Sequence, residues 1–257
     1  MDLGLRGKTA LVTGSSKGIG KACAATFATE GTRLSLCARS LPELERTATE
    51  LRAGGTEVLA TTADVTVASD VQRLIDRTLD RFGSIDILVA NAGGPPFGDF
   101  DELTDDQWRA ATELSMKATL RLVRAVVPLM RARRWGRIVS IQSTSVLVPI
   151  DGLALSNTIR PVVAQILTDL SAELAADGIL INVVCPGRTL TERFMAGHKR
   201  TGLSPEEYVR AQAAHIPLGR IADPAEIASV VVFLASEGAS GITGQVIPVD
   251  GGIVAAQ

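Results

Sequence analysis

Short apolar segments alternate with longer segments of helical periodicity along almost the whole 257-residue chain. Seven segments have the length and composition of buried strands: residues 8–13, 33–37, 57–61, 85–90, 137–141, 179–184 and 245–249. Between them, apolar residues recur at helical spacing over residues 19–30, 42–52, 68–82, 105–133, 154–176 and 224–235. This alternation predicts an α/β fold, a seven-stranded parallel sheet with helices on both faces. Right-handed crossovers make such a fold doubly wound.

No Pro/Ser-rich linker, low-complexity run or internal repeat divides the chain, so we expect a single domain over residues 1–257. The formal net charge of −2 gives no electrostatic reason to expect nucleic acid or an anionic membrane as a partner. The N-terminus has no signal-peptide pattern, and no apolar run approaches the ~18 residues of a membrane span. These features favour a cytoplasmic protein without a membrane partner.

The cysteine and histidine content argues against disulfides and metals. Cys23, Cys37 and Cys185 are odd in number and widely spaced in apolar or strand-like contexts, so we expect reduced core thiols. The only histidines are His198 and His215, and no Cys/His cluster has metal-ligand spacing. No metal site is therefore expected.

A glycine-rich turn follows the first predicted strand and leads directly into a helix. A bound diphosphate needs backbone N–H groups at close range, and glycine permits this approach because it has no side chain. The helix N-terminus adds a favourable partial positive charge. The turn therefore predicts a dinucleotide site that includes Gly14, Ser15, Ser16, Lys17, Gly18, Ile19 and Gly20.

The end of the second predicted strand bears on which dinucleotide is bound. An acidic residue there would hold the ribose 2′-hydroxyl of NAD, but residues 36–40 contain no carboxylate. Arg39 follows this strand, and Lys17 lies in the nearby glycine turn. Two cations and no acid suit a 2′-phosphate, so NADP(H) is favoured over NAD(H). Alternatively, Arg39 only lies along the surface or stacks on the adenine.

The glycine spacing resembles the TGxxxGxG motif of the short-chain dehydrogenase/reductase family, and further matches follow in order along nearly the whole chain. By resemblance, Asp64-Val65 is the adenine-binding segment and Asn91-Ala92-Gly93 is the NAG motif. Pro186-Gly187 with Thr191 matches the PGxxxT motif, which in the family holds the nicotinamide carboxamide. The overall look is closest to the 3-oxoacyl-acyl-carrier-protein reductase type. The resemblance implies a Rossmann-type domain with a substrate lid at about residues 190–217, assembled as a homotetramer or homodimer.

The catalytic positions depart from the family pattern. The family uses Ser, Tyr and Lys with a supporting Asn, and the corresponding positions here are Ser143, Ser156, Arg160 and Ser115. The single tyrosine of the chain, Tyr208, lies in the expected lid. No Tyr-x-x-x-Lys pair can therefore be written anywhere in the sequence.

The missing pair matters because carbonyl reduction needs a proton for the developing alkoxide. Losing a positioned acid typically costs ~10²–10⁴ in rate. The hydroxyl of Ser156 is far less acidic than a phenol. Arg160 can bind the ribose hydroxyls or stabilise an oxyanion, but it does not relay a proton at neutral pH. Pro161 disfavours helical geometry at Arg160, so we expect a kink or a late helix start there.

The sequence leaves three functions open. The first is an NADP(H)-dependent oxidoreductase that reduces a small-molecule carbonyl or oxidises an alcohol. Ser143 would polarise the oxygen, Ser145 could help to orient it, and water or a lid-side residue would supply the proton. Four further residues could reach the site if the lid folds over it: Asn157, His198, Tyr208 and His215.

The second function is an NADP(H)-binding sensor or partner subunit without dehydrogenase turnover. The third is other chemistry on the same fold. Dehalogenation is disfavoured among these chemistries. Halohydrin dehalogenases resemble the family but keep the tyrosine and lack the glycine turn, whereas this chain lacks the tyrosine and keeps the turn.

Overall fold

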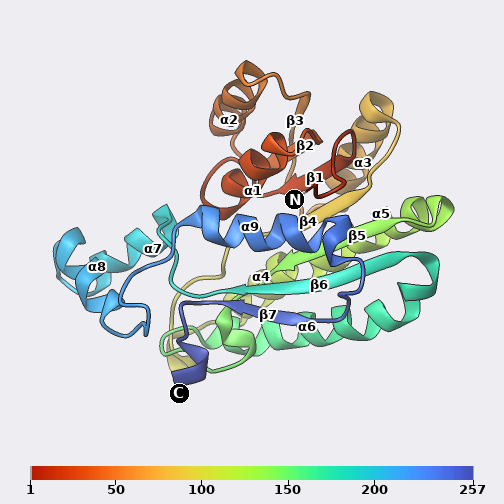
Figure 1. Ribbon diagram of the computed structural model, residues 1–257. Coiled ribbons are helices and arrows are strands. Elements are labelled where there is room, and N and C mark those ends of the chain that lie inside the picture. The colour runs from red at the N-terminus through yellow and green to blue at the C-terminus, as the bar shows by residue number, and fades with distance from the viewer. Residues whose placement is uncertain (1, 257) are drawn as a thin grey trace.

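The computed structural model describes residues 2–256, which form one sheet between two layers of helices (Figure 1). The sheet has seven parallel strands in the order β3-β2-β1-β4-β5-β6-β7. They are β1 (Thr9–Thr13), β2 (Arg33–Ala38), β3 (Val58–Thr62), β4 (Ile87–Asn91), β5 (Gly136–Ile141), β6 (Ile179–Pro186) and β7 (Val246–Val249). The strand order reverses between β1 and β4, as the doubly wound prediction requires. The predicted α/β fold class is thus confirmed.

Two separate apolar clusters hold the helices to the sheet. One face is covered by α1 (Gly18–Thr29), α2 (Leu41–Ala53) and α9 (Pro224–Leu234). The other is covered by α3 (Ala68–Phe82), α5 (Ala118–Arg133) and α6 (Ala154–Leu174). Every residue of β1 and of β5 is buried. This explains why these strands read as continuous apolar runs rather than alternating ones.

The remaining helices lie near the carboxyl ends of the strands. A short helix, α4 (Asp105–Ala111), precedes a π-helical turn at Thr112–Lys117 that continues into α5, so the predicted helix over 105–133 is a composite. A second group, α7 (Glu192–Met195) and α8 (Pro205–Ala213), projects beyond the strand ends at the left of Figure 1. Together with the 3-10 helix at Ala196–Arg200, these two helices form most of the segment expected to be a lid.

The late helix start expected at Pro161 is wrong. The helix α6 begins at Ala154, well before the proline, and continues through it to Leu174. Proline removes only one backbone N–H. The helix is held in place by its buried face, which includes Leu155, Ile159 and Val163 on either side of the proline.

Cys23, Cys37 and Cys185 are all buried free thiols, as expected. Burial raises the pKa of Cys23 and Cys37 to about 12 each, so both stay protonated at neutral pH. Within residues 2–256, no helix is long and apolar enough to cross a bilayer. The same residues contain no group of His, Cys, Asp and Glu side chains arranged to hold a metal ion.

Candidate active site

The segments that follow β1 to β6 line a cleft with a volume of about 1200 Å³ at the carboxyl ends of the strands. The structure brings most of the sequence-predicted site residues to its wall: Gly14, Ser16, Lys17, Gly18, Ile19, Arg39, Asp64, Val65, Asn91, Ala92, Gly93, Ser143, Ser156, Arg160, Pro186, Gly187 and Thr191. Three further candidates, Ser15, Gly20 and Ser115, lie outside the lining. A ligand in this position would sit at the point where the strand order reverses.

The glycine turn is held against the end of β4. The Asn91 amide Nδ2 donates to the carbonyl oxygens of Thr13 and Gly14, each at 3.2 Å. Gly14 and Gly18 have φ values of 60° and 55°, which favour glycine. A Cβ atom on Gly20 would overlap the Gly14 carbonyl oxygen, so Gly20 lets the turn close onto α1. These contacts leave the N-terminus of α1 at the cleft.

Ser15 has a structural role beneath the turn. Its side chain is fully buried, and its Oγ accepts a hydrogen bond from the Cys37 backbone N–H at 3.1 Å. The same hydroxyl lies 3.3 Å from the Cys37 carbonyl oxygen. Ser15 thus ties the turn to β2 and does not reach the cleft.

The two cations near the glycine turn and the end of β2 differ in their partners. The Lys17 ammonium pairs with Glu192 at 2.7 Å and with Glu43 at 3.5 Å. The hydrogen bond to Glu192 raises the pKa of Lys17 above its ordinary value. Arg39 is exposed at the cleft wall and forms no ion pair within the described part of the chain. The sequence analysis missed both carboxylates, because neither belongs to a motif.

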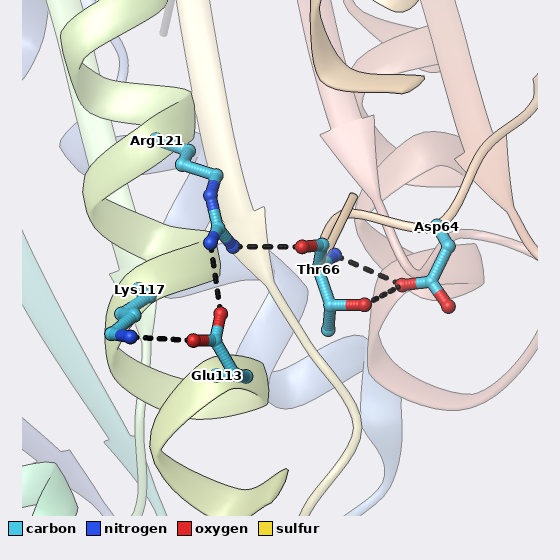
Figure 2. A network of polar contacts seen from close by, with 5 residues as sticks. All are labelled: Asp64, Thr66, Glu113, Lys117 and Arg121. Carbon is cyan, nitrogen blue, oxygen red and sulfur yellow. Dashed lines mark hydrogen bonds and ion pairs between the residues drawn. The ribbon is translucent and has the colours of Figure 1, made fainter. Parts of the chain in front are cut away.

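Asp64 is fixed by a polar network that reaches α5 (Figure 2). Its Oδ1 accepts from the backbone N–H and the hydroxyl of Thr66, at 2.9 and 2.7 Å. The Thr66 carbonyl accepts from Arg121 at 2.9 Å, and Arg121 also donates to Glu113 at 2.8 Å. Hydrogen bonds from Lys117 and Arg121 hold the pKa of Glu113 below its usual range. The network joins the loop after β3 to the π-helical turn.

Three serines follow β5 or face the segment after it: Ser143, Ser145 and Ser156. Ser143 Oγ accepts a hydrogen bond from the Ser145 backbone N–H at 3.2 Å, which leaves the Ser143 hydroxyl hydrogen free to donate toward the cleft. Ser145 and Ser156 are buried, and their Oγ atoms lie 2.9 Å apart. Ser156, at the position where the resemblance implies tyrosine, therefore has a serine as its hydrogen-bond partner.

Arg160 is a buried cation that pairs with no carboxylate in the part of the chain that the structure describes. Its side chain is 7% exposed, and it donates to the Gln142 side chain at 3.1 Å and to the Ile141 carbonyl at 3.4 Å. Burial lowers the pKa of Arg160 from 12.5 to about 10, with the charge of Arg193 as the next cause. The guanidinium is still charged at neutral pH, and the residue lines the cleft.

Ser115 lies in the π-helical turn, which packs against α6. Its Oγ is buried and has no hydrogen-bond partner among residues 2–256. The Ser115 carbonyl accepts from Thr119 at 2.9 Å. Its short side chain stays within this helix packing, which places it behind the cleft wall.

The sequence of the chain matches a known family over nearly its full length. Residues 14–254 match the family described as enoyl-(acyl carrier protein) reductase. Oxidoreductase UcpA of Escherichia coli O157:H7 is 37% identical over 250 residues, which cover 96% of this chain and 95% of that protein. The chain belongs to the short-chain dehydrogenase/reductase family.

Solved structures of the short-chain dehydrogenase/reductase fold resemble the whole chain. L-sorbose reductase from Gluconobacter frateurii, complexed with NADPH and L-sorbose, superposes with a TM-score of 0.95 at 35% identity and covers 99% of both chains. The actinorhodin polyketide ketoreductase with NADPH has a TM-score of 0.93 at 34% identity, over 96% of this chain and 97% of that one. We classify the chain as an oxidoreductase of this family.

The lid-side residues of this short-chain dehydrogenase/reductase divide into two groups. Tyr208 and His215 line the cleft, and the Tyr208 ring packs on Phe194 with ring centroids 5.2 Å apart. His198 does not line it, and its Nδ1 lies 2.6 Å from the Met195 carbonyl oxygen. Asn157 is also committed elsewhere, because its amide bonds to the backbone N–H and carbonyl of Ile150.

Sequence reasoning also missed Gln142, Arg188 and Arg193, three further polar residues of the cleft wall. Gln142 follows β5 directly and binds Arg160. Arg188 follows the PG pair, and Arg193 follows Thr191, so their places next to two motifs were the available signal. Because the family motifs do not specify these positions, only the fold shows that they face the cleft.

Proposed function

We propose that the chain is an NADP(H)-dependent oxidoreductase that reduces a carbonyl group or oxidises an alcohol on a small molecule. The observation that carries the proposal is the single cleft that joins the glycine turn, Asn91, Ser143 and Arg160. One end has the backbone geometry for a diphosphate at the N-terminus of α1. The other has hydroxyl and guanidinium donors for a reacting oxygen.

Support for NADP(H) over NAD(H) comes from the adenosine end of the cleft. Arg39 lies there without an ion pair in the described range, and β2 ends without the carboxylate that selects NAD. Lys17 supports it less than its charge suggests, because two carboxylates already hold its ammonium. Two structural neighbours were solved with NADPH.

The protein groups have distinct roles in this proposal. The nicotinamide supplies or accepts the hydride when bound. Ser143 donates a hydrogen bond to the substrate oxygen, and Arg160 stabilises the negative charge that develops there. No phenol stands beside them, so the proton comes from water along the Ser145–Ser156 pair or from the lid, where Tyr208 and His215 line the cleft.

The test is a titration of the purified protein with NADPH and with NADH, followed by nicotinamide fluorescence or calorimetry. We expect NADPH to bind at least tenfold more tightly than NADH, with Arg39→Gln removing most of that difference. If neither nucleotide binds at millimolar concentration, the oxidoreductase proposal is wrong. Binding justifies a carbonyl-substrate screen with Ser143→Ala as the control variant.

One observation favours a second candidate, a nucleotide-binding partner subunit without turnover. Ser156 is buried against Ser145, and no phenol–lysine pair exists to donate a proton. This candidate shares the cofactor site and differs only in chemistry. Single-turnover mixing of the NADPH complex with a broad carbonyl panel separates the two, because a sensor leaves NADPH unoxidised with every compound.

The proposal includes a lid and an assembly. The segment of about 190–217 would close on the substrate through α7 and α8. Separately, two or four copies of the chain would associate through α5 and α6 as a homodimer or homotetramer. Support for assembly is the exposure of Val162 on α6, at 47% of its surface. Light scattering coupled to size exclusion tests it, with a multiple of the 27.0 kDa chain mass expected.

A further inference from the structure

Besides Arg39, three arginine side chains line the cleft: Arg160, Arg188 and Arg193. None of them pairs with an Asp or Glu side chain of residues 2–256. Cations in a cleft cost free energy unless an anion is near. Three arginines without an acidic partner in one cleft therefore need a physical explanation.

The three guanidiniums differ in depth. Arg160 is buried at the base of the cleft, Arg188 is half-buried directly after Gly187, and Arg193 is exposed on the lid helix α7. Burial lowers the pKa of all three below the ordinary arginine value. Arg160 and Arg193 are close enough that the charge of Arg193 also lowers the pKa of Arg160.

Neutral contacts hold Arg193 in place without cancelling its charge. It donates to the carbonyl oxygens of Gly94 at 3.1 Å and Pro95 at 2.7 Å, and its guanidinium lies 4.8 Å from the centre of the Phe97 ring. These contacts bridge the lid to the loop after β4. They leave the positive charge at the cleft uncompensated.

The carboxylates of the cleft wall are committed elsewhere or lie at the surface. Glu43 and Glu192 share Lys17, and Asp64 accepts from Thr66. Asp151, the fourth carboxylate of the lining, is exposed and forms no ion pair in the described range. Buried negative charge is thus missing where the three arginines gather.

We propose that the substrate of this site carries an oxyanion group, a carboxylate or a phosphate, which Arg188 and Arg193 bind while Arg160 adds its charge from the cleft base. The planar guanidinium matches both oxyanions and can bind either through paired hydrogen bonds. This inference rests on the proposed function, since it names the substrate class of the same cleft. The apolar wall, which includes Val148, Pro149 and Ile150, would contact the rest of the molecule.

The phosphates of the nucleotide are the competing explanation for these cations. Thr191 contacts Gly18 of the glycine turn, with a Cβ on Gly18 lying 3.3 Å from Thr191 Cγ2, so Arg193 is not far from the expected diphosphate position. Arg188 follows β6, and Arg160 lies on α6 against the end of β5. The experiment must therefore measure the binding of the nucleotide and the binding of the oxyanion separately.

The test uses the full-length protein saturated with NADP⁺, so that the nucleotide fills its own anion sites. Benzoate, phenyl phosphate and neutral benzamide are titrated into this complex by calorimetry. We expect benzoate or phenyl phosphate to bind at least tenfold more tightly than benzamide, and added salt to weaken only the anions. The comparison of benzoate with phenyl phosphate shows which oxyanion the site prefers.

Variants assign the binding to residues. Arg188→Gln and Arg193→Gln should each weaken the preferred anion about tenfold and leave the dissociation constant of NADP⁺ within threefold. The matched control is Arg210→Gln, an exposed arginine on α8 in the same lid segment that does not line the cleft. It should change neither value.

Three outcomes overturn the inference. The first is benzamide binding as tightly as the anions, and the second is Arg210→Gln weakening the anions as much as the cleft variants do. If both cleft variants weaken NADP⁺ and leave the anion preference intact, the arginines serve the nucleotide and not the substrate. Failure of NADP⁺ itself to bind is a different result, because it removes the proposed function and the substrate class together.

Discussion

At the scale of the residue, the buried charge of Arg160 should lower the free energy of unfolding. Its folded pKa of about 10, against 12.5, corresponds to roughly 3 kcal/mol of penalty for the buried charge. Arg160→Met keeps most of the side-chain volume without that charge. We predict that the free energy of unfolding at pH 7 rises by about 1–3 kcal/mol while nucleotide binding weakens.

The pH dependence follows from the direction of the shift. The Arg160 guanidinium binds its proton more tightly in the unfolded chain than in the folded one. The gap in the free energy of unfolding between Arg160→Met and the natural protein therefore has its largest value below about pH 10. It shrinks as the pH rises above that value. Urea unfolding at pH 7 and at pH 10.5 measures both gaps. A variant that is less stable at pH 7 would show that the two hydrogen bonds to Gln142 and Ile141 outweigh desolvation.

Ser156 and Arg160 together allow a gain-of-function prediction. If the missing phenol limits the rate, Ser156→Tyr combined with Arg160→Lys should raise the turnover of an accepted carbonyl about 10²-fold or more. The matched control is Ser156→Phe with Arg160→Lys, which differs by one hydroxyl. Stopped-flow oxidation of NADPH compares the two variants. Equal rates would indicate that the chain already has an effective proton donor.

At the scale of the element, the helix α6 contains a proline, Pro161, in its interior. Pro161 lacks the N–H that would bond to the carbonyl four residues earlier, at Asn157. Pro161→Ala should restore that bond and raise the free energy of unfolding by about 1–3 kcal/mol, measured by chemical denaturation. Pro161→Gly is a useful companion, because it restores the same N–H with less helix propensity. No gain from alanine would mean that α6 is shaped around the proline.

Composite elements also explain why some boundaries were not predictable. Apolar spacing over 105–133 indicates one helix, and the chain is helical throughout. The π-helical turn inside it inserts no residue type that a sequence scan would detect. Its position depends on packing against α6 and on the Glu113–Arg121 contact of Figure 2.

For the whole molecule, nucleotide binding should stabilise the fold by mass action. At a free NADPH concentration about 100 times its dissociation constant, the gain is about 2.7 kcal/mol. For a chain of this size, that corresponds to a rise in Tm of roughly 5–10 °C. Differential scanning fluorimetry with NADPH and NADH at equal concentration measures it, and we expect the larger shift with NADPH. Equal shifts would contradict the role given to Arg39.

The sequence by itself determined the parallel sheet, the glycine turn and the order of the motifs. These features depend on local periodicity, on glycine's lack of a side chain and on short-range spacing, all of which can be read along the chain. It also showed the absence of a Tyr–Lys pair, because a missing residue type needs no coordinates. Even the placement of Ser143 in the same cleft as the glycine turn followed, since parallel strands end at the same edge.

Only the tertiary structure decided which charges are paired. Lys17 meets Glu192 although they lie far apart in the sequence, whereas Arg160, Arg188 and Arg193 gather with no carboxylate among them. Pairing depends on distances between segments that the fold brings together, and burial sets how strongly each charge is felt. For that reason the cofactor site could be predicted from motifs, while the positive end of the cleft could not.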